Sequence, residues 1–274
     1  MFNQLEILSD EQSEKLYTIR KYIKDLGSVC IAYSGGVDST LVASLAFEQL
    51  GSKAIAITGI SPALANTLRE EAKSQAKWIG VKHLEITTSE LDQSTYSKNP
   101  KDRCFACKKE LHKHTTILSK KLNFKIVLDG VNLDDLKDYR PGIQASKQAG
   151  VISPLAKFKF SKQDIRDISR ALGFPWWDKP AQPCLSSRFP YGHEITSERL
   201  KMVEKAEDYL KEGGLSEVRV RCQGSTARIE IPKDELKHFF NKYNFSELVH
   251  YFSNLGFNCT SLDLEGLVSG KLNK

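Results

Sequence analysis

The residue types that could do chemistry in this chain fall into three groups. A glycine-rich turn, Ser34-Gly-Gly-Val-Asp-Ser39, combines small residues with hydroxyl and carboxylate groups. Cys104 and Cys107 form a Cys-x-x-Cys pair, and Cys184 lies in a proline-flanked stretch. Two arginines alternate with a valine in a strand-like run near the C-terminus. These residue types suit the binding of an anion and the chemistry of sulfur.

The glycine-rich turn has the context of a phosphate-binding loop. An apolar run, Val29–Tyr33, precedes it, and a helix-like run, Leu41–Leu50, follows it at once. In such a strand–turn–helix unit, free backbone N–H groups and the helix dipole hold a phosphate. The sequence therefore predicts phosphate binding here. The alternative is a Gly-Gly turn without function, as any α/β protein can contain.

Each residue of the turn has an expected role. Gly35 and Gly36 let the backbone approach an anion that a Cβ would block, and Ser34 and Ser39 add hydroxyl donors. Asp38 suits an anion site only if a cation such as Mg²⁺ accompanies the phosphate. The spacing matches neither Gly-x-x-x-x-Gly-Lys-Ser/Thr nor Gly-x-Gly-x-x-Gly.

The Cys-x-x-Cys pair opens a predicted helix over residues 104–122. The helix dipole favours thiolates at that position. Three functional interpretations stay open: a redox dithiol, half of a zinc site, or part of an iron–sulfur site. A structural zinc takes four ligands, and the sequence has no second Cys-x-x-Cys. With Cys184 as a third ligand, three thiolates would hold a four-iron cluster and leave one iron open; otherwise, Cys104 and Cys107 are two unrelated buried thiols.

Cys184 and Arg188 lie in a stretch, residues 176–193, with three prolines and no periodicity. Such a stretch is typical of a functional loop or of a connection between domains. A cysteine between prolines is not a core cysteine, and Arg188 would favour its thiolate and bind an anion. A loop that only joins two domains explains the prolines but not the Cys-x-x-x-Arg pairing.

Arg219 and Arg221 share one face of a predicted strand, because Val220 points to the opposite face. Two neighbouring guanidinium groups suit a phosphate or a pair of carboxylates; a solvated strand face is the alternative. Arg228 on the partner strand supports an anion site, and Glu230 would hold the arginines in place. The six histidines form no ligand set.

Strands and helices alternate up to residue 172. Strands are expected at 29–33, 53–59, 81–86 and 125–130, and helices at 10–26, 41–50, 66–79, 104–122 and 162–172. Asp10 is the expected cap of the first helix. This alternation predicts an α/β fold, a doubly wound parallel sheet that binds ligands at the carboxyl edge of its strands. Residues 132–142 are expected to be a loop.

The remainder of the chain changes character. Helices are expected at 196–212, 233–242 and 245–255, and strands at 217–222, 227–231 and 260–264. This pattern predicts a smaller α+β domain. We therefore expect a first domain at 1–180 and a C-terminal domain at 181–274.

The composition is that of a globular protein of 274 residues, with 40% apolar and 27% charged residues. The net charge of +6 comes from scattered residues, which suits a small anionic substrate and does not require nucleic acid. No signal-like N-terminus and no apolar run of ~18 residues is present, so a cytoplasmic protein without a membrane segment is expected. There the six cysteines would stay reduced, and Cys30, Cys222 and Cys259 in strand-like runs would be buried.

The glycine-rich turn resembles the PP-loop of the ATP pyrophosphatases, in which the loop grips the pyrophosphate of ATP and an AMP group is transferred to the substrate. Further segments resemble one branch of that superfamily, the LarE family, and the resemblance runs nearly end to end. These segments are residues 103–111, 130–142, 183–192, 219–221 and 263–273.

The resemblance implies an ATP-dependent sulfur transferase in the biosynthesis of the nickel-pincer nucleotide of lactate racemase. Its substrate would be pyridinium-3,5-biscarboxylic acid mononucleotide, in which ATP adenylylates a carboxylate, sulfur attacks the acyl-adenylate and AMP leaves. Some family members sacrifice the sulfur of a cysteine at the position of Cys184. Others have three cysteines and resemble [4Fe-4S] enzymes, and Cys104, Cys107 and Cys184 place this chain with them.

The resemblance also implies site residues and assembly. Arg219 and Arg221 would hold the substrate phosphate, and Arg188 a carboxylate or the AMP phosphate. A homo-oligomer, often a hexamer in the family, is implied. The usual family ending Gly-Tyr-Arg-Ser-Gly-Ser is here Gly266-Leu-Val-Ser-Gly-Lys, so any role of that aromatic residue and arginine is missing. The implied ATP-binding residues, with Mg²⁺, are Ser34, Gly35, Gly36, Asp38 and Ser39.

Three other functions remain as alternatives. A tRNA thiolase of the same superfamily also combines a PP-loop with cysteines, but the modest charge and the lack of a basic, aromatic-studded appendage argue against it. An amide-forming enzyme of the superfamily uses ammonia and has no need of three thiols. A zinc or redox module without catalytic activity would bind metal and not ATP.

Overall fold

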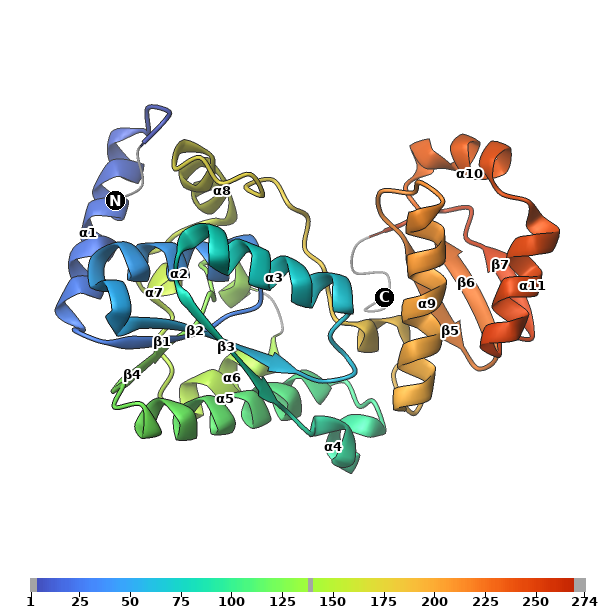
Figure 1. Cartoon of the computed structure of the whole chain (residues 1–274), viewed down its shortest axis with the longest axis horizontal. Coiled ribbons are helices and arrows are strands. Elements are labelled where there is room, and N and C mark those ends of the chain that lie inside the picture. Colours follow the sequence, from blue (N-terminus) through green and yellow to red (C-terminus); the bar gives the residue numbers. More distant parts are fainter. Residues whose placement is uncertain (1–3, 138–139, 269–274) are drawn as a thin grey trace. The chain divides into compact units, whose positions relative to one another are not determined.

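The computed structural model describes residues 4–137 and 140–268, and the chain divides into two compact units (Figure 1). The first, here the N-terminal unit, comprises Met1–Ser61, Asn66–Glu90 and Asp102–Gln182. The second, the C-terminal unit, comprises Pro62–Ala65, Leu91–Lys101 and Pro183–Lys274.

A four-stranded parallel sheet, in the order β3-β2-β1-β4, forms the centre of the N-terminal unit. All four strands lie within a few residues of their predicted positions. They are β1 (Val29–Ala32), β2 (Ala54–Ile60), β3 (Lys82–Thr87) and β4 (Ile126–Leu128). β1 is buried along its whole length because it pairs on both edges and is covered on both faces.

Helices cover both faces of this sheet, which confirms the predicted doubly wound α/β fold (Figure 1). One face is covered by α1 (Asp10–Asp25), α2 (Val37–Leu50), α3 (Asn66–Ile79) and α8 (Lys162–Ala171). The other face is covered by α5 (Arg103–Lys121) and α6 (Pro141–Gln148). Shorter helical turns are η1 (Gly51–Lys53), η2 (Glu90–Asp92), η3 (Asp134–Lys137) and α7 (Pro154–Lys157).

Helix α6 is an element that the sequence analysis missed, since residues 132–142 were expected to be a loop. Pro141 takes the first helical position, where its missing N–H costs nothing. A Cβ at Gly142 would lie 2.9 Å from Lys108 Cγ, so this glycine lets α6 pack closely on the N-terminal part of α5. Further along the contact, His112 Nε2 lies 2.8 Å from Ser146 Oγ, and burial lowers the pKa of His112 to about 4.

The predicted cap of the first helix is wrong by one residue. Ser9 is the N-cap of α1: its Oγ accepts a hydrogen bond from Gln12 N, and the Gln12 side chain accepts one from Ser9 N. This reciprocal pair is a capping box. Asp10 is instead the first helical residue, where its charge complements the helix dipole.

The C-terminal unit has an α+β fold with a three-stranded sheet, in the order β5-β6-β7. The strands are β5 (Arg219–Gln223), β6 (Thr226–Glu230) and β7 (Cys259–Leu262); β6 is antiparallel to β5 and parallel to β7. The helices are α4 (Ser94–Ser97), η4 (Leu185–Arg188), α9 (Ser197–Glu212), η5 (Lys233–Glu235), α10 (Leu236–Lys242) and α11 (Phe245–Leu255). Cys30 and Cys222 are buried as expected, but Cys259 is exposed because it begins the edge strand β7.

Two short segments of the C-terminal unit come from the part of the chain that the sequence analysis assigns to the first domain. These segments, Pro62–Ala65 and Leu91–Lys101, bind the stretch that follows Pro183. Leu185 N donates to Ala63 O at 2.9 Å, and Asn99 Nδ2 donates to Pro190 O at 2.7 Å. Such contacts between distant segments leave no signal in composition or periodicity. None of the described helices is long and apolar enough to cross a membrane.

The corrected cap of α1 gives a test of the fold. Ser9→Ala removes a side-chain acceptor from the helix N-terminus and should lower the free energy of unfolding by about 1 kcal/mol. Asp10→Ala removes only a favourable helix-dipole interaction and should cost about 0.3–0.5 kcal/mol. Urea unfolding followed by circular dichroism compares the two variants. A larger decrease in the free energy of unfolding for Asp10→Ala than for Ser9→Ala would contradict the assignment of the cap.

Candidate active site

The glycine-rich turn joins β1 to α2 at the carboxyl edge of the parallel sheet. Gly36 is the N-cap of α2, and this end of the helix has no side-chain cap hydrogen bond among the described residues. The first N–H groups of α2 therefore remain available for an anion. Ser39 Oγ accepts from Ser34 N at 3.2 Å and lies 3.2 Å from Ser34 Oγ, which closes the turn on itself.

Close packing fixes the backbone of this turn. Gly35 has φ +70°, and a Cβ there would lie 3.0 Å from Ala72 Cβ on α3. A Cβ at Gly130, after β4, would lie 2.7 Å from Ser39 N. Only glycine meets both the conformation and the space at position 35. The turn is thus held between α3 and the segment after β4.

A buried hydrogen-bond network lies on either side of the turn. Gln75 Oε1 of α3 accepts from Tyr33 Oη, before the turn, and from Thr40 Oγ1, after it, both at 3.2 Å. Burial raises the pKa of Tyr33 to about 12, so its phenol stays a donor. The two ends of the turn are therefore anchored to the same side chain.

Asp38, the expected Mg²⁺ ligand, has two partners. Lys162 Nζ, at the start of α8, lies 2.5 Å from Asp38 Oδ2, and Asn132 Nδ2 donates to Asp38 Oδ1 at 3.0 Å. Mg²⁺ in phosphate sites takes one or two carboxylates and keeps several waters, so a single carboxylate beside the α2 N-terminus fits it. Asp38 is the residue that would hold the ion.

Cys104 and Cys107 lie in the first turn of α5, where their spacing puts both on one face. Cys104 is exposed and Cys107 is half-buried. Asp102 is the N-cap of α5 but its side chain makes no cap hydrogen bond, so the helix dipole at this end is available to thiolates.

The three cysteines are not brought together as a ligand set within one unit. Cys184 belongs to the C-terminal unit, whereas Cys104 and Cys107 belong to the N-terminal unit. Within residues 4–137 and 140–268, no three His, Cys, Asp or Glu side chains are grouped as metal ligands. Neither unit by itself therefore fits a four-iron cluster held by three thiolates, although thiolates are the donors that such a cluster takes.

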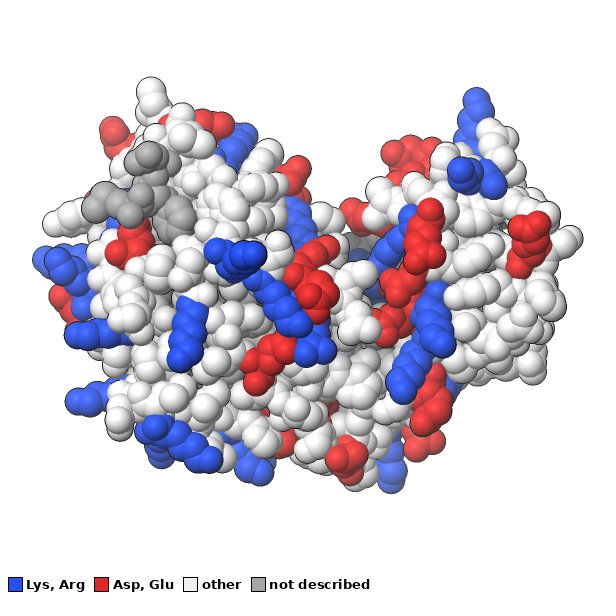
Figure 2. Space-filling view, in the orientation of Figure 1, with Lys and Arg blue, Asp and Glu red and all other residues white. Residues whose placement is uncertain are grey.

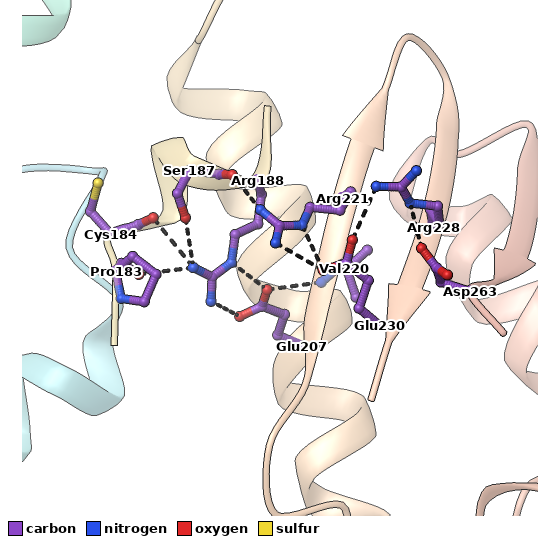
Figure 3. Close-up of polar contacts among 10 residues, drawn as sticks. All are labelled: Pro183, Cys184, Ser187, Arg188, Glu207, Val220, Arg221, Arg228, Glu230 and Asp263. Carbon is purple, nitrogen blue, oxygen red and sulfur yellow. Dashed lines mark hydrogen bonds and ion pairs between the residues drawn. The ribbon is translucent and has the colours of Figure 1, made fainter. Parts of the chain in front are cut away.

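Cys184 is exposed and is the N-cap of the turn η4 (Figure 3). Its side chain points away from the guanidinium of Arg188, which instead binds the backbone of the loop. Arg188 Nη1 donates to Pro183 O at 2.8 Å and to Cys184 O at 3.4 Å. The loop around the thiol is thus held by its carbonyl groups, which leaves the sulfur accessible.

Arg188 is buried and pairs with a buried glutamate of α9. Its Nε and Nη2 donate to the two oxygens of Glu207 at 2.7 and 2.9 Å, a bidentate pair. Glu207 also accepts from Val220 N of β5 at 2.9 Å, so one carboxylate ties the cysteine loop to the sheet.

The strand arginines have different environments. Arg221 is buried, pairs with Glu230 at 2.8 Å and donates to Ser187 O at 2.7 Å (Figure 3). Arg219 is half-buried and has no ion pair with any residue that the structure describes. Burial, together with the nearby Arg188 and Arg221 charges, lowers the pKa of Arg219. Arg219 is therefore the member of this cluster whose charge is not neutralised.

No family model matches the chain, but it is similar to curated proteins along almost its whole length. It is 34% identical over 261 residues to the pyridinium-3,5-bisthiocarboxylic acid mononucleotide synthase of Lactiplantibacillus plantarum, covering 94% of each chain. The chain belongs to the LarE family.

Two further relatives of this LarE-family chain are uncharacterized proteins. The one from Synechocystis sp. is 52% identical over 260 residues, covering 95% of this chain and 97% of the relative. The one from Methanocaldococcus jannaschii is 32% identical over 255 residues, covering 92% of this chain and 96% of the relative.

Two residues of this LarE-family site were missed by the sequence analysis. Lys162 was treated only as part of a helix, and Glu207 was not singled out. Both lie far along the chain from their partners, Asp38 and Arg188. Glu207 had one weak signal, because a glutamate on the buried face of a predicted helix needs a partner.

The buried pair gives the second prediction. Glu207→Ala leaves the Arg188 charge buried without its partner and should lower the free energy of unfolding by about 3–5 kcal/mol. Glu212→Ala removes an exposed glutamate from the same helix and should change it by less than about 0.5 kcal/mol. Urea unfolding measures both. Equal stabilities of the two variants would show that the pair does not hold the cysteine loop.

Proposed function

We propose that this chain is an ATP-dependent sulfur transferase acting on pyridinium-3,5-biscarboxylic acid mononucleotide. The observation that carries the proposal is the end-to-end similarity to a synthase of the corresponding bisthiocarboxylic acid mononucleotide. Conversion of a carboxylate to a thiocarboxylate needs activation of the carboxylate, because oxide is a poor leaving group. The product would serve the nickel-pincer nucleotide cofactor of lactate racemase.

The residues of the turn would carry out the activation. The uncapped N–H groups of α2, with Ser34 and Ser39, would bind the pyrophosphate of ATP. Mg²⁺ at Asp38 would supply stabilisation of charge on the departing pyrophosphate. The substrate carboxylate attacks the α-phosphorus, an acyl-adenylate forms and pyrophosphate leaves. Donors fixed before the reaction need no reorganisation as charge develops.

The substrate phosphate would bind at Arg219. Its half-buried guanidinium beside Arg188 and Arg221 forms a positive site that an anion would neutralise. The resemblance assigns Arg188 and Arg221 to substrate contacts. Their main role would be to hold the cysteine loop in place, because both donate hydrogen bonds to its carbonyl groups. Their direct contact with substrate stays a prediction.

The sulfur would come from a nucleophile at Cys184. Attack of its sulfur on the acyl-adenylate releases AMP and gives a thioester to the protein. Loss of the Cα proton of residue 184, together with cleavage of the Cβ–S bond, would then form the Cα=Cβ double bond of dehydroalanine and release the thiocarboxylate. The alternative is a sulfide carried on a [4Fe-4S] cluster that Cys104, Cys107 and Cys184 would hold.

The third prediction separates these two sulfur sources. Protein reconstituted anaerobically with iron and sulfide is incubated with ATP, Mg²⁺, the mononucleotide and an excess of sulfide, and thiocarboxylate is measured by mass spectrometry. A cluster enzyme should turn over repeatedly, and Cys104→Ala and Cys107→Ala should each lose both the brown colour and turnover. A sacrificial enzyme should give at most one sulfur per chain, with dehydroalanine at 184, and should tolerate these two substitutions. Product formation by Cys184→Ala at the parental rate would exclude both routes.

The fourth prediction concerns the phosphate site. Arg219→Leu should weaken equilibrium binding of the mononucleotide about tenfold or more, since it removes a charge-assisted hydrogen bond. Lys205→Leu removes an exposed charge from the same unit and should leave the affinity unchanged. Isothermal titration calorimetry measures both, and an unaltered affinity in Arg219→Leu would place the phosphate elsewhere.

A tRNA thiolase is one of the rival functions. Figure 2 shows acidic and basic side chains interspersed on the face it displays, which does not favour a polyanion. Gel-shift with tRNA at physiological salt distinguishes the two functions. Tight tRNA binding would favour the rival. The cytoplasmic location and the homo-oligomer expected from the sequence stay predictions.

A further inference from the structure

The pairing of Lys162 with Asp38 joins residues that are 124 positions apart. Asp38 belongs to the first turn of α2, where the glycine-rich turn ends, and Lys162 is the first residue of α8. Their side chains are 35% and 22% exposed, so both can be reached by a ligand. A partly exposed ion pair contributes little to stability, about 0–1 kcal/mol, so stability alone is a weak reason for it.

The backbone of Lys162 is fixed while its ammonium group stays adjustable. Lys162 N donates to Asp134 Oδ2 at 2.8 Å, and Ser161 with Asp164 forms a capping box around the same helix start. Asp164 in turn pairs with Lys15 of α1 at 3.0 Å. Because a lysine ammonium lies at the end of a flexible four-carbon stem, it can change partners without moving the helix.

The charge of Asp38 opposes anion binding at the turn. A carboxylate in the first turn of α2 would repel the phosphate that the helix N-terminus attracts, unless a cation neutralises it. Lys162 neutralises it in the ligand-free chain. Mg²⁺ arriving with ATP would do the same, and both cations compete for the same carboxylate. Asn132 Nδ2 and the half-buried Asp135, whose pKa is raised mainly by partial burial, also lie beside this pair.

We infer that Lys162 is a phosphate-binding residue. In the ligand-free chain its ammonium group pairs with Asp38, and it is released when a metal–nucleotide complex binds. When Mg²⁺ binds Asp38, the released ammonium group of Lys162 binds the phosphate oxygens. The positive charge of Lys162 then neutralises the nucleotide and no longer the carboxylate of Asp38. No covalent bond changes in this exchange. The inference rests on the proposed function in taking ATP as the ligand, and it adds a residue to the site.

The exchange predicts effects of opposite sign in one variant. Lys162→Met keeps the length of the side chain and removes its charge. Without the competing ammonium, Mn²⁺ alone should bind the ligand-free protein about threefold or more tighter. The Mg²⁺ complex of α,β-methylene-ATP should bind about tenfold or more weaker, because a charge-assisted phosphate contact is lost. Electron paramagnetic resonance of Mn²⁺ and isothermal titration calorimetry of the nucleotide measure the two affinities.

Two further variants control the experiment. Lys15→Met removes the other lysine pair at the start of α8 and should match the parent in both affinities. Lys162→Arg keeps the charge and should restrict metal binding as the parent does. It should also bind the nucleotide better than Lys162→Met.

The outcomes separate this inference from the function on which it rests. If Lys162→Met weakens metal and nucleotide binding together, Lys162 only supports Asp38 and the exchange is wrong. If the parent binds the nucleotide and Lys162→Met binds both ligands as the parent does, the exchange is likewise wrong, while ATP binding stands. If the parent itself does not bind the nucleotide, the proposed ATP chemistry fails and the exchange fails with it.

Discussion

Two buried arginine–glutamate pairs, Arg188–Glu207 and Arg221–Glu230, are the constraint on which the rest of the C-terminal unit depends. A charge buried without a partner costs several kcal/mol, so each arginine must be matched. Glu207 pairs with Arg188, and Glu230 pairs with both Arg221 and Arg228, whereas Arg219 has no ion pair with any described residue. The same pairs fix the cysteine loop, because the remaining guanidinium N–H groups bind its carbonyl oxygens.

In the N-terminal unit, close packing of the backbone fixes the glycine-rich turn, whereas buried side-chain ion pairs fix the cysteine loop of the C-terminal unit. Gly35 against α3 and Gly130 against Ser39 bring three segments of backbone closer than any other residue would allow. The result is a helix N-terminus of fixed geometry that has no side-chain cap among the residues the structure describes, as suits an anion site. The carboxylate of Asp38 is the exception in that site, and its pairing with Lys162 neutralises it.

The sequence predicted what depends on local pattern. The four parallel strands, most helices and the glycine-rich turn follow from periodicity and from the strand–turn–helix context. The α1 cap was within reach, since Ser9 and Gln12 have the capping-box spacing. Helix α6 was missed because Pro141 and Gly142 are typical of loops, although proline also suits a first helical turn.

The partners of the charged residues could not be predicted in the same way. The same face of β5 presents Arg219 and Arg221, as expected from the alternation along a strand, but alternation does not show which guanidinium has a carboxylate partner. Glu207 and Lys162 reach their partners only through the tertiary fold. The residue pattern thus predicts candidate groups for the chemistry, and the fold determines which of their charges remain unpaired.

Activation of a carboxylate by cleavage between the α- and β-phosphates of ATP is the central claim of this account. The most direct measurement is chromatography of the nucleotides formed by the purified protein with ATP and Mg²⁺, with and without pyridinium-3,5-biscarboxylic acid mononucleotide. We expect AMP and pyrophosphate, formed in amounts that depend on the mononucleotide. Formation of ADP and phosphate, or of AMP at the same rate without the mononucleotide, would contradict the account.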